Sequence, residues 1–126
     1  MSLRTEIRRR YGTFRGFVRL ALGTCEFACG RLRPWTRPEL GRVRRLVFVC
    51  LGNINRSAYG QVVAERRGLP AASFGLSTTT GHAATPQAIA TARTLGLDLD
   101  AHRATDMADF EIRPGDLLLV MEIQKP

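Results

Sequence analysis

Apolar and polar positions alternate in blocks along the chain, and the period changes from one block to the next. Residues 45–50 form an almost continuously apolar run, Arg-Leu-Val-Phe-Val-Cys, which is typical of a strand buried on both faces. A helix is predicted from about Ser57 to Arg67, because Gly68 and Pro70 then interrupt the pattern. Residues 71–76 predict a short second strand, and residues 117–121 predict another buried strand.

A segment with clear helix signals lies between the second and third predicted strands. Thr85 is a suitable N-cap, Pro86 takes the first helical position, and Gly96 follows the last predicted residue, Leu95. A short helical piece is expected near residues 105–110. The order β-α-β-α-β predicts a parallel α/β sheet covered by helices, with ligands bound at the carboxyl ends of the strands. Cys50 stands at one of these ends.

The N-terminal segment has a different pattern. Apolar residues recur at steps of three and four, which predicts one face of an amphipathic helix formed by Phe14, Phe17, Val18, Ala21, Leu22, Cys25, Ala28, Cys29 and Leu32. Arginines surround this face, namely Arg8, Arg9, Arg10, Arg15 and Arg19. The helix either lies on an anionic membrane surface or an acidic partner, or packs on its own domain with a solvated basic face. Two prolines within residues 33–38 indicate a linker, so we expect a basic helical extension over 1–43 and a globular domain over 44–126.

The positive charge of the chain is confined to this extension. The formal net charge is +8, but residues 1–45 hold 12 arginines against three glutamates, and the rest is close to neutral. No nucleic-acid partner is therefore expected. Arg19 breaks the apolar stretch that a secretory signal would need, and no apolar run is long enough to span a membrane. The three cysteines lack metal-site spacing, so we expect no metal and a reduced, cytoplasmic protein, peripheral to the membrane if the helix lies on it.

The candidate chemistry lies in the loop after the first strand, Cys50-Leu-Gly-Asn-Ile-Asn-Arg56-Ser57. The N–H groups of a tight Gly/Asn loop and the N-terminus of the next helix favour a dianion such as phosphate. Arg56 adds a planar fork that matches two phosphoryl oxygens. In that field the Cys50 thiol is expected to ionise below its free pKa of about 8.5, which makes it a nucleophile.

The spacing of Cys50 and Arg56 is not specific by itself. Cys25 and Arg31 have the same spacing without a phosphate cradle around them. A buried strand-end cysteine is the alternative interpretation of Cys50, and ordinary turn and cap chemistry is the alternative for Asn53 and Ser57. The strand, the Gly-Asn turn and the helix start together favour a phosphate loop.

Val49–Ser57 resembles the signature loop of the low-molecular-weight protein tyrosine phosphatases, whose fold is a flavodoxin-like three-layer parallel sheet. The resemblance covers about residues 44–122 and includes Ser73–Leu76, Thr85–Asp98, His102-Arg103-Ala104 and Leu117–Glu122. It implies hydrolysis of phosphate monoesters, with a phosphotyrosine protein as substrate and with no cofactor.

The resemblance also implies a role for each residue of the loop. Cys50 would form a cysteinyl-phosphate, and Arg56 would bind the phosphoryl oxygens and stabilise the transition state. Phosphate binding would involve the loop residues Leu51, Gly52, Asn53, Ile54, Asn55, Arg56 and Ser57. Ser57 would also donate a hydrogen bond to the thiolate, while Asn53 and Ser73 would hold the shape of the loop. His102 is expected to be a structural hydrogen-bonding residue rather than a base.

Three departures from the family pattern bear on activity. Asn55 stands where many members carry a second cysteine, and Ala58 stands where proline is usual. The general acid of the family, an Asp-Pro pair after the fourth strand, does not occur in these 126 residues. We therefore expect a sheet without its last strand and helix, weak activity, and marginal stability that the N-terminal helix improves by covering the open face.

Two other functions stay open. A non-catalytic phosphate-binding or interaction module would need the loop but no general acid. An arsenate reductase, which shares the fold, would need further cysteines, and none follows Cys50. Among the carboxylates, Asp106, Asp109 and Asp116 are expected away from the loop, and Glu122 alone is expected beside it.

Overall fold

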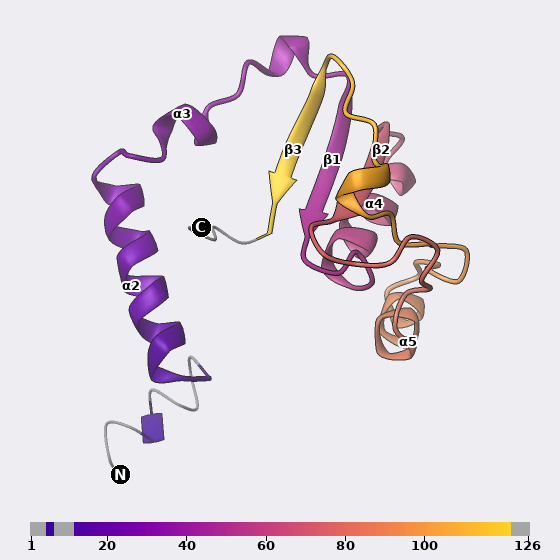
Figure 1. Cartoon of the computed structure of the whole chain (residues 1–126), viewed down its shortest axis with the longest axis horizontal. Coiled ribbons are helices and arrows are strands. Elements are labelled where there is room, and N and C mark those ends of the chain that lie inside the picture. The colour runs from indigo at the N-terminus through magenta and orange to yellow at the C-terminus, as the bar shows by residue number, and fades with distance from the viewer. Residues whose placement is uncertain (1–4, 7–11, 122–126) are drawn as a thin grey trace. The chain divides into compact units, whose positions relative to one another are not determined.

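A computed structural model describes residues 5, 6 and 12–121 of the chain, which divides into two compact units, residues 1–38 and 39–126. The second unit is built on three parallel strands in the order β2-β1-β3 (Figure 1). β1 (Arg45–Cys50) lies in the centre, between β2 (Ala71–Gly75) and β3 (Asp116–Val120). The apolar run of β1 is explained by this central position, because both of its edges are paired and both of its faces are covered.

Alternate residues of β1 pack on opposite faces of the sheet. Phe48 faces helix α4 (Arg56–Arg66), and a Cβ placed on Gly60 of that helix would lie 2.6 Å from the Phe48 ring. Glycine at position 60 therefore sets how closely the helix approaches the strand. On the other face Val47 and Val49 are buried with Phe74, and Phe110 packs against them.

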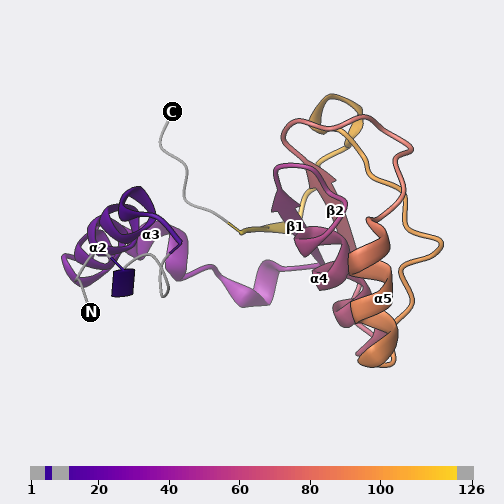
Figure 2. The same cartoon turned by 90° about the horizontal axis from the view of Figure 1, so that it is seen from below.

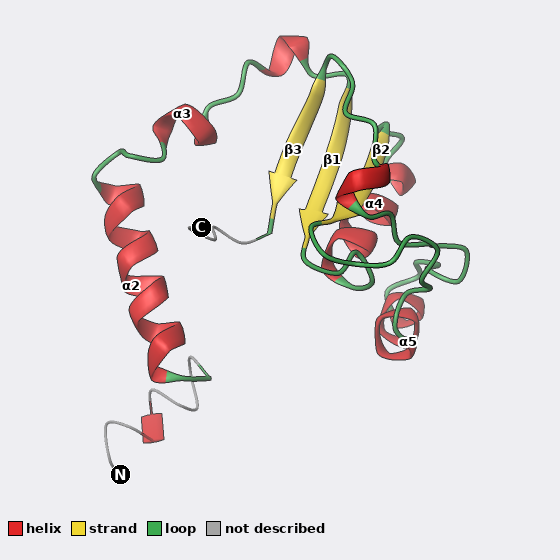
Figure 3. Ribbon diagram, in the orientation of Figure 1, coloured by secondary structure: helices red, strands yellow, loops and turns green. Residues whose placement is uncertain are grey.

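Helix α5 (Pro86–Thr94) packs on α4, on the same side of the sheet (Figure 2). Small residues at their contact allow the close approach, and the buried cluster consists of Ala58, Ala84, Ala92 and Leu99. The ribbon coloured by secondary structure shows the short 3₁₀ helix η2 (Met107–Asp109) ahead of β3 (Figure 3). Its C-cap, Phe110, belongs to the cluster on the face opposite α4.

The strand order reverses direction at β1. The chain runs from β1 through α4 to β2 on one side, and then returns past β1 to form β3 on the other. In parallel sheets this reversal opens a crevice at the carboxyl ends of the strands, where ligands bind. Cys50 is the last residue of β1 and lies at that point.

An ion pair fixes the opposite, amino-terminal edge of the sheet. Arg45 donates from Nε and Nη2 to the two carboxylate oxygens of Asp116, at 2.8 and 2.7 Å. The two side chains are 18% and 2% exposed, so solvent screens the pair poorly. Hydrogen bonding from Arg45 lowers the pKa of Asp116, although burial opposes this effect. Arg45 begins β1 and Cys50 ends it, so Asp116 lies at the opposite end of the strand from Cys50, as predicted.

The parallel α/β fold is confirmed, and β1 has the predicted bounds. The expected helical piece near 105–110 is a single 3₁₀ turn, because the Asp106 side chain caps it at the Ala108 N–H. Within the described residues β3 is paired only with β1, and its Leu118 and Val120 are 40% and 60% exposed. The described part of β3 is thus an edge strand with an apolar face.

The first unit contains helix α2 (Phe14–Ala28), whose N-cap Thr13 accepts a hydrogen bond from the Gly16 N–H. The segment predicted as a linker, residues 33–38, contains the short helix α3 (Arg33–Thr36). Pro34 sits in its first turn, where proline needs no N–H partner. No residue of α2 is buried, and Arg8, Arg9 and Arg10 lie outside the described residues. None of the described helices is both long and apolar enough to cross a membrane.

Candidate active site

The chain leaves β1 at Cys50, turns over residues 51–55 and enters α4 at Arg56. Asn53 makes the tight turn possible, since its φ of 51° lies in the left-handed region that asparagine tolerates. The N-cap residue of α4, Asn55, makes no side-chain hydrogen bond to the first turn. The N–H groups of that turn therefore form the kind of site that binds an anion.

The Cys50 sulfur is held at the base of this turn. Its Sγ lies 2.9 Å from the Ser57 hydroxyl and 3.2 Å from the Asn53 backbone nitrogen, and the residue is 7% exposed. Burial raises the pKa of the thiol, but hydrogen bonds from the Ser57 hydroxyl and from the N–H groups of Ser57, Asn53 and Gly52 lower it by more. The net pKa is below the usual value for cysteine, so the thiolate is favoured.

A buried asparagine organises the loop. The Asn53 side chain is fully buried, and its Nδ2 donates to Ser57 Oγ at 2.8 Å and to Ser73 Oγ at 2.7 Å. Its Oδ1 accepts the Thr105 N–H at 2.9 Å. Because Ser57 accepts from Asn53 and a thiolate has no proton to give, the Ser57 hydroxyl hydrogen points to Cys50 Sγ. The network thereby fixes which group donates to the sulfur.

Two further side chains extend this network. Ser73 donates to Gln61 Oε1 at 2.6 Å, which ties β2 to α4. His102 Nε2 lies 2.7 Å from the Asn53 carbonyl oxygen. A carbonyl only accepts, so Nε2 carries the proton in this contact. His102 therefore makes a hydrogen bond to the backbone of the loop, which is the kind of role that the family resemblance implied.

The loop also rests on the end of β2. The Leu76 and Ser77 N–H groups donate to the carbonyls of Cys50 and Leu51, which continues the strand pairing beyond Gly75. A Cβ at Gly75 would lie 2.8 Å from the Leu51 carbonyl oxygen. Glycine is thus required at this position for the loop to pack where it does.

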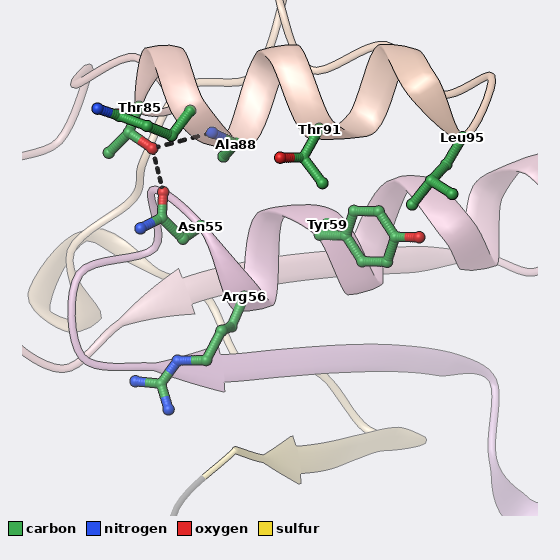
Figure 4. A pocket seen from close by; sticks show the side chains of 8 residues that line it. Asn55, Arg56, Tyr59, Thr85, Ala88, Thr91 and Leu95 are labelled. Carbon is green, nitrogen blue, oxygen red and sulfur yellow. Dashed lines mark hydrogen bonds between the residues drawn. The ribbon is translucent and has the colours of Figure 1, made fainter. Parts of the chain in front are cut away.

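Asn55 connects the loop to α5. Thr85 donates from its hydroxyl to Asn55 Oδ1 at 2.5 Å (Figure 4). The Thr85 N–H also donates to the Ile54 carbonyl. Beside this contact lies a cavity of about 390 Å³ between α4 and α5, lined by Asn55, Arg56, Tyr59, Thr85, Gln87, Ala88, Thr91 and Leu95. Cys50 does not line it. The Arg56 side chain extends away from α5, as Figure 4 shows.

The carboxylates do not all lie where the sequence suggested. Asp106 forms an isolated parallel bridge with Gly75, the partner of Cys50, and accepts the Thr78 N–H at 3.1 Å. Asp109 accepts the Thr80 hydroxyl at 2.6 Å. The prediction that Asp106 lies away from this edge of the sheet is therefore wrong, because residue 106 pairs with the carboxyl end of β2. The contact of Asp109 with Thr80 does not bring it to residues 50–57, so its predicted place stays a prediction. Glu122 lies outside the described residues.

Asp106 is nevertheless unsuited to donate a proton. Hydrogen bonds from the Ala108 and Thr78 N–H groups lower its pKa, with burial as the smaller opposing effect. The carboxylate is therefore ionised at neutral pH and holds the 76–80 loop in place. The described residues contain no cluster of three side chains that could bind a metal ion.

The structure brings Cys50, Asn53, Ser57 and Ser73 together in one hydrogen-bonded cluster. Leu51, Gly52, Ile54 and Asn55 form the turn, and Arg56 opens α4. The sequence prediction missed Gln61, Gly75, Thr85 and Thr105. Of these four residues, Gln61 alone had a local signal: it follows Ser57 by four residues and so lies on the same face of the helix. The other pair with this spacing, Cys25 and Arg31, lies on α2 and the turn after it, so Cys25 is in a helix and not at the end of a strand.

Comparison with known proteins identifies the second unit. Residues 45–125 match the family model for low molecular weight phosphotyrosine protein phosphatase. A curated relative, the probable low molecular weight protein-tyrosine-phosphatase EpsP of Ralstonia nicotianae, is 32% identical over 82 residues, which are 64% of this chain and 57% of the relative. The chain thus spans little more than half the length of this relative.

Two solved structures agree with this match. The Erwinia amylovora tyrosine phosphatase AmsI has a TM-score of 0.52 and 31% identity, over 64% of this chain and 55% of that one. The Escherichia coli K30 tyrosine phosphatase Wzb, crystallised with sulphate, has a TM-score of 0.54 and 30% identity, over 64% and 58%. The matched region contains the whole loop from Cys50 to Ser57, together with β1, α4, β2, α5 and β3. The chain therefore belongs to the low molecular weight phosphotyrosine protein phosphatase family.

Proposed function

We propose that the chain hydrolyses phosphate monoesters, with phosphotyrosine in proteins as the substrate, through a cysteinyl-phosphate on Cys50. The observation that carries this proposal is the position of the Cys50 sulfur, 2.9 Å from the Ser57 hydroxyl and 3.2 Å from the Asn53 nitrogen. These donors favour the thiolate at the N-terminus of α4, where an anionic phosphate also binds. The family and the names of the relatives support phosphotyrosine as the substrate class.

The proposed reaction has two steps. The Cys50 thiolate attacks phosphorus, the bond to the tyrosine oxygen breaks, and the leaving oxygen takes up a proton. Water then attacks the cysteinyl-phosphate, which releases phosphate and restores the thiolate. Arg56 and the loop N–H groups from Leu51 to Ser57 stabilise the charge on the phosphoryl oxygens in both transition states.

The source of the proton limits the rate in this scheme. The sequence contains no Asp-Pro pair, and Asp106 is held ionised by its backbone donors. Protonation of a leaving group typically contributes about 10²–10⁴ in rate. We therefore propose that these 126 residues act well on esters with acidic leaving groups and slowly on others.

Trapping of the intermediate tests this proposal. Rapid acid quenching after mixing with p-nitrophenyl phosphate should yield one phosphoryl group on Cys50 by peptide mass spectrometry, and Cys50→Ser should abolish p-nitrophenol release. Phosphate binding without a phosphocysteine or any release would instead favour the non-catalytic phosphate-binding module.

We also propose an anionic partner for the arginine-rich N-terminal segment, either a membrane surface or an acidic protein. Its charge supports this, since residues 1–45 hold 12 arginines against three glutamates. A reducing compartment such as the cytoplasm suits a reaction that depends on a free thiol. The location would be peripheral to the membrane if the partner is the lipid surface.

A further inference from the structure

We infer that residues 14–37 form an interfacial anchor that inserts the apolar face of α2 into an anionic phospholipid bilayer, with arginines at the headgroups. This inference rests on the anionic partner proposed above and chooses between its two forms. It does not depend on hydrolysis by Cys50.

The apolar face of α2 is not covered by the other described residues of its own unit. No residue of the helix is buried, and Phe14 and Leu22 are 67% and 60% exposed. These two side chains lie on the face that runs through Val18, Cys25 and Cys29 at helical spacing. An exposed face of this kind marks an interaction surface, because burying its leucine and phenylalanine side chains against a partner would lower the free energy.

The apolar surface is broader than one face. Leu20 and Phe27 lie on the other side of the helix and are 55% and 66% exposed. Only Arg15, Arg19 and Glu26 are charged within α2, and the angular step of about 100° per residue places all three in one narrow sector. A helix with a wide apolar sector and a narrow charged strip suits a bilayer, which accommodates apolar side chains around much of the helix.

The surroundings of the helix add the remaining features of an interfacial segment. Trp35 follows in α3 and is 84% exposed, and Arg31, Arg33 and Arg37 lie around it. Tryptophan prefers the headgroup region because its ring is apolar and its N–H is polar. Arginines next to it attract anionic lipids and extend their charged ends towards the headgroups.

An acidic protein is the weaker choice for the partner. It would match the arginines, but it would leave the exposed phenylalanines and leucines of α2 without a counterpart unless it also offered an apolar groove. A bilayer satisfies both halves of the pattern at once. The charge and the apolar surface therefore point to the same occupant.

Vesicle binding by the full chain tests the inference, and Trp35 is its built-in reporter as the only tryptophan of the sequence. Vesicles of phosphatidylglycerol and phosphatidylcholine in equal parts should shift the Trp35 emission to shorter wavelength and carry the chain down in sedimentation. Pure phosphatidylcholine vesicles should bind much more weakly, and added salt should weaken binding to the anionic vesicles. Cys50→Ser should bind as the unmodified chain does, which separates this test from that of the hydrolysis.

Matched variants distinguish the two contributions. Leu22→Asp should weaken vesicle binding about tenfold or more, because it places a charge on the inserted face. Leu69→Asp makes the same change at an exposed leucine of the second unit and should leave binding unchanged. Arg19→Glu should weaken binding by more than the roughly fivefold expected for loss of one arginine, whereas Arg67→Glu should have little effect.

Three results would overturn the inference. The Trp35 emission could stay unshifted with anionic vesicles at low salt, or Leu22→Asp could bind as well as Leu69→Asp. In the third result, the chain would bind an acidic polypeptide such as polyglutamate as tightly as it binds the anionic vesicles, and Leu22→Asp would weaken both by the same factor. That result would favour the protein partner. If the second result came with a loss of thermal stability in Leu22→Asp, it would show that the helix covers its own domain.

Discussion

Replacement of Ser57 by alanine tests the central electrostatic feature of the site. The Ser57 hydroxyl lies 2.9 Å from Cys50 Sγ and is fully buried, so water has little room to replace it. The hydroxyl lowers the pKa of Cys50, and the backbone donors that also lower it remain in the variant. Removal of a group that stabilises the thiolate must raise the pKa, and the sign of the expected change is therefore fixed.

The size of the change follows from the bond that is lost. A hydrogen bond to a charged group contributes about 1.5–3 kcal/mol, and about 1.4 kcal/mol corresponds to one pKa unit. We therefore expect the pKa of Cys50 to rise by about 1–2 units, so that the ratio of thiolate to thiol at a given pH falls about 10- to 100-fold. Asn53 Nδ2 loses one acceptor as well, which should destabilise the fold by about 1–2 kcal/mol.

The assay is the pH dependence of alkylation by iodoacetamide. Cys25 and Cys29 are first replaced by serine, so that Cys50 is the only thiol of the chain. Ser77→Ala, an exposed serine on the neighbouring loop, is the matched control and should leave the midpoint unchanged. An unchanged midpoint in a folded Ser57→Ala variant would refute the role given to this hydroxyl.

Four further predictions concern the loop, the phosphate, the leaving group and the sheet. Gly75→Ala should weaken phosphate binding about tenfold or more by calorimetry, because the new Cβ meets the Leu51 carbonyl, whereas Gly41→Ala meets nothing within 4 Å; equal affinities would contradict this. Arg56→Lys should raise the inhibition constant of phosphate about tenfold, since lysine keeps the charge but not the fork, and an unchanged constant would argue against bidentate binding. The kcat ratio of p-nitrophenyl to phenyl phosphate should be large for these 126 residues, and a ratio near one would mean that a carboxyl group in the chain donates the proton. Asp116→Asn should lower the free energy of unfolding in urea by about 3 kcal/mol near pH 7. Because the folded pKa of Asp116 is lowered, the stabilisation by its carboxylate is present above about pH 4 and is lost as pH falls through the folded pKa. Parallel pH profiles of stability for the variant and the unmodified chain would contradict this contribution of Asp116.

Local sequence was sufficient for the elements and for the nucleophile loop. The apolar run of β1, the caps of α5 and the Gly-Asn turn after Cys50 are each encoded within a few residues, and their signals depend on nothing distant. The short helix α3 was not predicted, because proline both ends helices and begins them and the pattern around Pro34 does not distinguish the two. The identity of Cys50 as the candidate nucleophile likewise needed only its neighbours and the resemblance that they carry.

The environment of that nucleophile was decided by tertiary structure. Asn53 is held by Ser73, Thr105 and His102, which follow it by 20 to 52 residues, and Asp106 is bridged to Gly75, the strand partner of Cys50. Such contacts depend on the register of the strands and on where the chain returns to the sheet, and a local sequence pattern predicts neither of these. The sequence by itself determined which thiol stands at the end of β1, before a turn of the kind that binds phosphate. Only the folded sheet determined which donors stabilise its anion and which carboxylate is held ionised at the end of β2, because hydrogen-bond partners are selected by distance in space.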